Sequence, residues 1–281
     1  MSFEDINRLH GARLPNETNL SQLIRAPLVL LMFFGTEPRI SAQNAPMPNP
    51  GRPTVSTPAT LTPPGYFQFE TGVLSAWTSP ELSSQTQLNE VVKFSFSSRI
   101  ELLAAVEPLA HSRSAGVATN EAGGVSLGVQ TVLYQGEGAR PTVGASYFHN
   151  VYGGNAPDLD IGSAMNSVLM LASADVKKFH YDFNLFLNEV VAEPVRRAQL
   201  GQSLSIAHPL TAKLAISGEI WHFTQPLLRG HAVGNLWALS YSPNRALVFD
   251  AGFNRGLTSS STQWEVFAGF TYLLPHRLFG R

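Results

Sequence analysis

The sequence of 281 residues contains no cysteine and few charged side chains. The absence of cysteine excludes disulfides, thiolate metal sites and cysteine nucleophiles. Asp, Glu, Lys and Arg make up 14% of the chain, whereas soluble globular domains contain roughly 25%. The 19 basic and 20 acidic residues nearly cancel. This balance argues against a nucleic-acid binder, which carries a basic surface, and against disorder driven by net charge.

Long hydrophobic runs are also missing. The strongest apolar run, residues 26–34, is about half as long as a membrane-spanning helix. Arg25 precedes it, and helix breakers follow before the small residue Ala42. This order is typical of a secretory signal peptide, so we predict a signal peptide over residues 1–42. A buried helix of a soluble domain is the alternative interpretation of the apolar run.

The rest of the chain divides by composition. Residues 43–64 are rich in Pro, Thr, Ser and Asn, which predicts an extended, poorly ordered periplasmic leader. After Pro64 no stretch shows a sustained helical period or approaches 18 apolar residues, which excludes an α-helical membrane protein. We expect a single β-domain over residues 65–274 and a C-terminal tail over residues 275–281.

From Gly65 onward, apolar residues recur at every second position in about a dozen segments. Successive side chains of a strand point to opposite faces, so each segment has one apolar and one polar face. A soluble sandwich turns the apolar face inward, whereas a transmembrane barrel turns it outward to lipid. The clearest segment sets Phe179, Tyr181, Phe183, Leu185 and Leu187 against Lys178, His180, Asp182, Asn184 and Asn188.

Three features favour the barrel. The segments span roughly 10 to 14 residues, closer to the 9 to 11 of a tilted membrane strand than to the 5 to 6 of a soluble strand. Their polar faces are rich in Gly, Ser and Asn, and short and longer links alternate. We therefore predict an all-β fold, a single antiparallel up-and-down transmembrane β-barrel of about 12 strands, of the outer-membrane type. A soluble sandwich is the alternative.

Aromatic residues gather near the ends of the segments. Outer-membrane barrels carry aromatic girdles at both membrane interfaces, although aromatic residues also favour strands in general. We assign these residues to the girdles: Tyr66, Trp77, Tyr134, Tyr152, Trp221, Trp237, Tyr241, Trp264 and Tyr272.

The start of the predicted barrel carries a motif. Gly51-Arg52-Pro53 is followed by a Ser/Thr-rich stretch. A Pro-Gly turn then leads to a predicted strand that contains Gln68 and Glu70. This pattern resembles the family of outer-membrane transporters named after the meta-pathway of phenol degradation. Gly51 stands where that family has Asp, and the specific motif is confined to residues 51–72. The resemblance implies a Gram-negative outer-membrane barrel that acts as a transporter, without fixing its solute.

Charged residues on the predicted inward faces are the candidate functional residues. Such charges can line a pore and set its selectivity, or they can pair across a packed lumen and hold the barrel together. Both signs occur, so no strong anion or cation preference follows. The predicted lumen-lining residues are Glu70, Lys93, Arg99, Glu101, Asp182, Arg197, Lys213, Glu219, Asp250 and Glu265.

The sequence gives little support for catalysis. Its eight histidines form no His-Glu-x-x-His spacing. His111-Ser112-Arg113 is the nearest approach to a serine–histidine pair. We predict no enzyme activity, no metal site and no cofactor.

The function that we expect is passive movement of a small solute, hydrophobic, weakly polar or aromatic, through an outer-membrane channel. The expected partners are outer-membrane lipid, the barrel-assembly machinery and the solute, with no nucleic acid. Two alternatives remain open: an outer-membrane enzyme that modifies lipid, and a structural barrel with a plugged lumen.

Overall fold

The computed structural model describes residues 46–157, 159, 164–192, 194–228 and 230–278, and these residues form an all-β fold. The predicted signal peptide and its cleavage site lie outside the described residues. Within the described ranges, no helix is long and apolar enough to cross a membrane. The strands, in chain order, are β1 (Phe67–Trp77), β2 (Ser84–Ser95), β3 (Ile100–Ser114), β4 (Val117–Glu121), β5 (Val125–Tyr134), β6 (Thr142–Tyr152), β7 (Ala164–Val176), β8 (Phe179–Ala192), β9 (Val195–Pro209), β10 (Leu214–Gln225), β11 (Gly230–Tyr241), β12 (Leu247–Gly256) and β13 (Trp264–Leu273).

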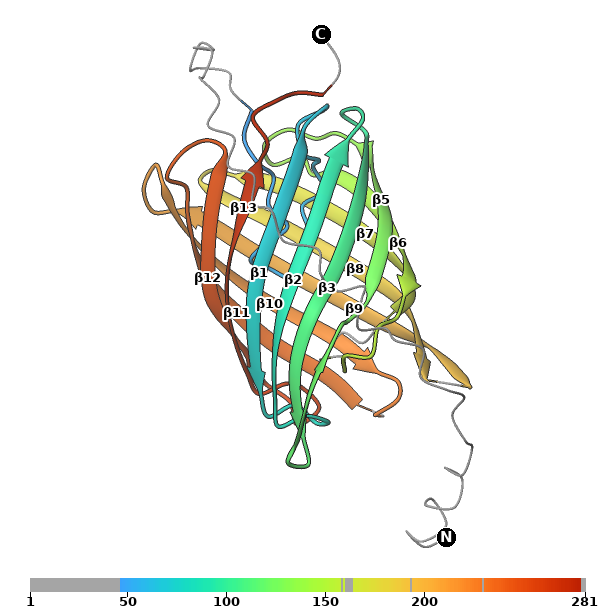
Figure 1. Ribbon diagram of the computed structural model, residues 1–281. Coiled ribbons are helices and arrows are strands. Elements are labelled where there is room, and N and C mark those ends of the chain that lie inside the picture. Colours follow the sequence, from blue (N-terminus) through green and yellow to red (C-terminus); the bar gives the residue numbers. More distant parts are fainter. Residues whose placement is uncertain (1–45, 158, 160–163, 193, 229, 279–281) are drawn as a thin grey trace, which may run out of the picture. The chain divides into compact units, whose positions relative to one another are not determined.

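Twelve of these strands close into a ring (Figure 1). Each pairs antiparallel with its neighbours along the chain, and β1 pairs with both β2 and β13. The ring passes from β3 directly to β5, because β4 pairs with the last residues of β3 and extends beyond the ring as a hairpin. The prediction of an antiparallel barrel of about 12 strands is therefore confirmed. The alternation in the sequence did not reveal β4.

The barrel has two distinct ends. We call the end where β1 begins and β13 ends the terminal end, and the opposite end the loop end. The links at the terminal end are residues 96–99, 135–141, 177–178, 210–213 and 242–246. The links at the loop end are residues 78–83, 115–124 (which include β4), 153–163, 193–194, 226–229 and 257–263.

The wall of the barrel is apolar on the outside and polar on the inside. On β8, the side chain of Leu185 is 44% exposed, while its neighbour Asn184 is 0% exposed. Phe183 and Leu187 are exposed in the same way, and Asp182 and Asn188 are buried. This alternation is the reverse of that in a soluble sandwich, whose apolar face is buried, and it matches the outward apolar face of a membrane barrel.

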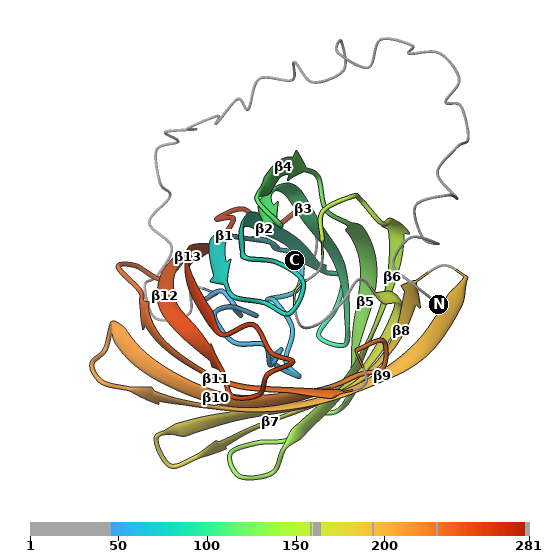
Figure 2. The ribbon, with the colours of Figure 1, turned by 90° about the horizontal axis from the view of Figure 1, so that it is seen from below.

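The residues before β1 differ most from the sequence-based expectation. Residues 49–62 lie inside the ring (Figure 2), where they hydrogen-bond to side chains of several strands. We predicted a poorly ordered leader from composition, because Pro and Thr are common in loops. The order comes instead from partners on the barrel wall. We call residues 49–62 the lumen segment.

Most of the predicted girdle residues lie at or near strand ends, but Trp237 lies in the interior of β11 and Trp221 faces inward. Trp77 and Trp264 are paired neighbours at the loop end, and both are exposed on the outside. Trp221 was assigned to the outer girdle, and this assignment is wrong. Its indole is buried in the lumen and donates a hydrogen bond from Nε1 to Oδ1 of Asn254, 2.9 Å away. The residue follows Glu219 at an even spacing, so it shares the inward face.

The wall is apolar on the outside, so a charged side chain placed there should destabilise the barrel. We expect the loss of stability to depend on the position of the charge along the strand. Leu185 lies midway along β8 and Phe179 begins the same strand, and both face outward. In a bilayer, Leu185→Arg should lower the free energy of unfolding by about 2–4 kcal/mol, and Phe179→Arg by about 0–1 kcal/mol, because the cost of Arg falls from the midplane to the interface. Urea titration in liposomes, followed by tryptophan fluorescence, measures both. Equal effects of the two variants would contradict a lipid-facing outer wall.

Candidate functional site

The backbone of the lumen segment is held by polar side chains of the barrel wall. Its prolines lack an N–H group and prevent a continuous β-ladder, so its remaining N–H groups need other acceptors. The wall supplies these acceptors from strands spread around the ring. The donors and acceptors are Asn49 N to Gln68 (2.7 Å), Gly51 N to Glu70 (3.0 Å), Thr57 N to Asn184 (2.6 Å), Ala59 N to Ser173 (2.7 Å) and Thr62 N to Glu101 (2.8 Å).

Glu219 of β10 is the most heavily used acceptor. Its carboxylate accepts hydrogen bonds from the backbone N–H groups of Val55 and Ser56, both at 2.7 Å, and from the Ser56 hydroxyl. The hydroxyls of Ser56 and Ser203 lie 2.8 Å apart. A buried carboxylate is tolerated when several donors satisfy it. Glu219 therefore anchors the middle of the lumen segment.

Arg52 forms the second anchor. Its guanidinium binds the carboxylate of Asp250 on β12 through Nε and Nη2, at 3.2 and 3.0 Å. The guanidinium lies over two glycines, Gly72 of β1 and Gly269 of β13, which are paired neighbours. A Cβ added at Gly72 would lie 2.3 Å from Cζ of Arg52. The two glycines thus leave the space in which the Arg52–Asp250 pair forms.

A buried ion pair lies beside Gly51. Nζ of Lys93 on β2 is 2.6 Å from Oε1 of Glu70 on β1, and both side chains are buried. Gln68 donates a further hydrogen bond to Glu70 at 2.8 Å. Each buried charge in this group therefore has a partner, which the low dielectric of a lumen requires.

The predicted lumen-lining residues fall into two groups. Glu70, Lys93, Glu101, Asp182, Glu219 and Asp250 are buried. Glu265 is partly buried and accepts a hydrogen bond from Asn254 at 2.9 Å. Arg99 and Lys213 lie in terminal-end links and are exposed, and Arg197 is exposed near the loop end of β9. The selectivity role of these residues stays a prediction.

Five of the six buried residues contact the lumen segment or belong to its anchors. The sixth, Asp182, accepts a hydrogen bond from Ser173 and is 3.2 Å from His180, and Ser173 itself accepts one from the segment. Glu70 thus pairs with Lys93 and Asp250 with Arg52, whereas Glu101 and Glu219 bind N–H and O–H groups of the lumen segment.

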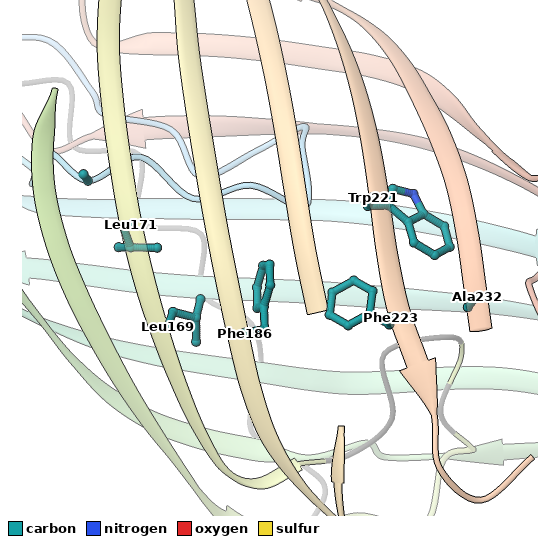
Figure 3. Packing of buried hydrophobic residues seen from close by; sticks show 7 residues of the cluster. Leu169, Leu171, Phe186, Trp221, Phe223 and Ala232 are labelled. Atoms are coloured by element: carbon teal, nitrogen blue, oxygen red, sulfur yellow. The ribbon is translucent and has the colours of Figure 1, made fainter. Parts of the chain in front are cut away.

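Sequence reasoning missed an apolar patch on the inner wall. The patch contains Leu169, Leu171, Phe186, Trp221, Phe223 and Ala232 together with Ala59 of the lumen segment (Figure 3). In β7 both faces are apolar, since Val168 and Met170 point outward while Leu169 and Leu171 point inward. A period-two pattern cannot identify the inward apolar residues of such a strand. The even spacing from Glu219 was the available signal for Trp221 and Phe223.

A cavity of about 320 Å³ adjoins this patch on the loop-end side of the lumen segment. Its apolar lining includes Leu74, Trp221, Leu236 and Phe267, and Phe267 packs with Leu236 in a second inner cluster. Polar side chains from four strands and from the lumen segment complete the lining. We call it the aromatic-lined cavity, and its polar residues are Arg52, Thr54, Gln87, Glu107, Asn254 and Glu265.

A second cavity of about 350 Å³ lies nearby and shares Glu107 with the first. Its lining includes Glu90, Asn150 and Asn188. Arg52 is the one basic residue among the described residues that line either cavity, and its guanidinium is bound to Asp250. Carboxylates therefore dominate the charge around these two spaces.

The described residues offer no metal site and no serine–histidine pair at position 111. No group of three or more His, Asp or Glu is placed to hold a metal ion in the described ranges. His111 is exposed and contacts Asn120, whereas Ser112 is buried. Adjacent residues of a strand point to opposite faces, so these two side chains cannot act together.

The fold is similar to solved outer-membrane channels. An outer membrane channel from Pseudomonas putida F1 superposes with a TM-score of 0.56 at 12% identity, over 77% of this chain and 98% of that chain. The NanC porin gives a TM-score of 0.51 at 9% identity, over 73% and 98%. No family model and no curated protein matches the chain. At these identities the likeness shows the fold alone.

The close contact between the Arg52 guanidinium and Gly72 permits a direct test of how the lumen segment is held. Gly72→Ala should displace the guanidinium from Asp250, because the added methyl occupies its place. We expect faster hydrogen–deuterium exchange in residues 49–62, while exchange in β1 to β13 stays slow. Gly153→Ala is the matched control, since a Cβ there meets no atom within 4 Å. Unchanged exchange in both variants would show that the Arg52–Asp250 pair does not hold the segment.

Proposed function

We propose that the chain is a passive channel for small solutes in the outer membrane of a Gram-negative bacterium, and that the described structure is its closed state. The inside-out wall and the likeness to outer-membrane channels support the location. The resemblance of residues 51–72 to transporters named after phenol degradation points to the same class. The expected help of the barrel-assembly machinery follows from the location.

The observation that carries the proposal is the way in which the lumen is closed. The lumen segment is held by side-chain hydrogen bonds and ion pairs, not by a β-ladder. Each hydrogen bond to a neutral group contributes only about 0.5–1.5 kcal/mol net, and each one to a carboxylate about 1.5–3 kcal/mol, because water can replace it. Displacement of the segment would open a polar lumen while leaving every strand pair of the wall intact.

The solute class follows from the aromatic-lined cavity. A volume of about 320 Å³ is within the range of small-molecule sites, which combine apolar walls with a few polar groups. Trp221 and Phe267 offer faces for an aromatic or other apolar body, and Glu107 and Glu265 offer acceptors. We propose a small amphipathic solute with an apolar body and a hydrogen-bond-donating or cationic group.

A structural barrel is the second candidate, and one observation favours it. Glu70, Asp182 and Glu219, which an open water path would pass, are buried. Glu70 and Glu219 bind the lumen segment directly. A channel therefore requires the segment to move, whereas a structural barrel does not, and this difference separates the two candidates.

A reversible cross-link tests the movement. Ser56 and Ser203 lie side by side, with their hydroxyl oxygens 2.8 Å apart, and the chain has no cysteine. The double variant Ser56→Cys/Ser203→Cys should form a disulfide, since the two side chains already meet. We expect conductance in planar bilayers at least tenfold lower in the oxidised than in the reduced protein. The single variants, treated in the same way, are the controls.

Two outcomes would contradict the channel that we propose. Equal conductance of the oxidised and reduced forms would show that solutes pass without movement of the segment. Absence of conductance and of liposome swelling in both forms, with the barrel folded, would favour the structural barrel. Folding is checked by the faster gel mobility of the unheated protein, and fractionation checks the membrane location separately.

The four tryptophans permit a binding test for the aromatic-lined cavity. Trp221 is the buried one, whereas Trp77, Trp237 and Trp264 are exposed on the outer wall. Titration with benzylamine should change the tryptophan fluorescence saturably in the wild type and in Trp237→Phe, and not in Trp221→Phe. We expect benzylamine to bind more tightly than phenol and phenol more tightly than benzoate, because carboxylates line the cavity. Tighter binding of benzoate would contradict the proposed solute class.

A further inference from the structure

The terminal end of the barrel carries a ring of basic side chains. Each of the five links at this end contains at least one Lys or Arg, and Glu137 is the one acidic residue in them. The links belong to strand pairs distributed around the ring of strands. We call these residues the basic ring: Arg99, Arg140, Lys177, Lys178, Lys213 and Arg245.

The side chains of the basic ring are available to a partner. All six are exposed. None of them takes part in an ion pair between described residues. Six cations held at one end without acidic partners repel one another, so an anionic surface brought to this end would be bound favourably.

The ring lies directly beyond the apolar outer wall. Arg99 precedes Ile100, Lys178 precedes Phe179, and both of these apolar side chains are exposed on the outside. Tyr241 is likewise exposed just before the link that contains Arg245. Apolar and aromatic side chains at the edge of a barrel mark the boundary of the hydrocarbon. The basic side chains therefore reach the depth at which lipid headgroups lie.

The described residues at the opposite end carry both signs. Glu81 and Glu121 lie in links at the loop end, and Arg113, Arg196 and Arg197 extend from strands near it. Among the described residues, the larger excess of basic side chains is therefore at the terminal end.

We propose that the basic ring binds the phosphate headgroups of anionic phospholipids, such as phosphatidylglycerol, in the leaflet next to the terminal end. Each Lys or Arg close to an anionic membrane surface strengthens binding several-fold. Several cations on separate links suit several lipid molecules around the barrel better than one compact anion.

The test compares three variants in detergent micelles, with fluorescent phosphatidylglycerol and phosphatidylcholine as probes and anisotropy as the readout. The wild type should bind the anionic probe at least tenfold more tightly than the zwitterionic one. Arg99→Gln/Lys213→Gln/Arg245→Gln should abolish this preference, whereas Arg99→Lys/Lys213→Arg/Arg245→Lys should keep it. Arg113→Gln/Arg197→Gln, at the loop end, should keep it as well. Unheated gel mobility confirms that each variant is folded.

Three results would overturn the proposal. The first is an unchanged preference in the charge-removing triple variant, and the second is its loss in Arg113→Gln/Arg197→Gln. The third is displacement of the lipid probe by millimolar inorganic phosphate, which would identify a site for a free anion. A preference that disappears between about 0.1 M and 1 M salt, as the screening length falls from about 10 to 3 Å, supports it. None of these readouts depends on conductance, so they stand apart from the channel proposal.

Discussion

The need to pair every backbone N–H and C=O group determines the rest of this structure. A wall whose outer side is apolar offers no water to unpaired groups, so the sheet must close on itself. The double pairing of β1, with β2 on one side and β13 on the other, completes that closure. Closure in turn fixes the faces, because alternate side chains must then point either to the outside or into a confined lumen.

The lumen segment provides hydrogen-bond partners for the inner face of the closed wall. The wall satisfies its own backbone but presents inward side chains, such as Glu219 and Asn184, that need donors. The proline-containing segment has backbone N–H groups that cannot join a ladder, and it supplies those donors. Glycines on the wall make the contact close, since the guanidinium of Arg52 rests over Gly72 and Gly269. The segment and the wall thus satisfy each other.

The sequence predicts the features that repeat along the chain and misses those that depend on distant partners. The alternation in β8 identifies outward Leu185 and inward Asn184 correctly, because it is a local property of one strand. The order of the lumen segment depends on pairs such as Arg52 with Asp250, 198 residues apart, which no local pattern reveals. Leu169 and Leu171 are missed for another reason, since an apolar residue on both faces of β7 leaves no alternation to read.

In the channel that we propose, the strength of the anchors along the lumen segment determines how the lumen opens. The neutral contacts of Asn49 and Thr57 exchange with water at small cost, so the segment can loosen there without disturbing the wall. Separating Arg52 from the buried carboxylate of Asp250 leaves a charge unpaired, which costs several kcal/mol unless water enters with the movement. Opening and hydration of the lumen are therefore coupled. In the channel that we propose, a solute that fills the aromatic-lined cavity lies beside Arg52 and acts on the Arg52–Asp250 anchor of the segment.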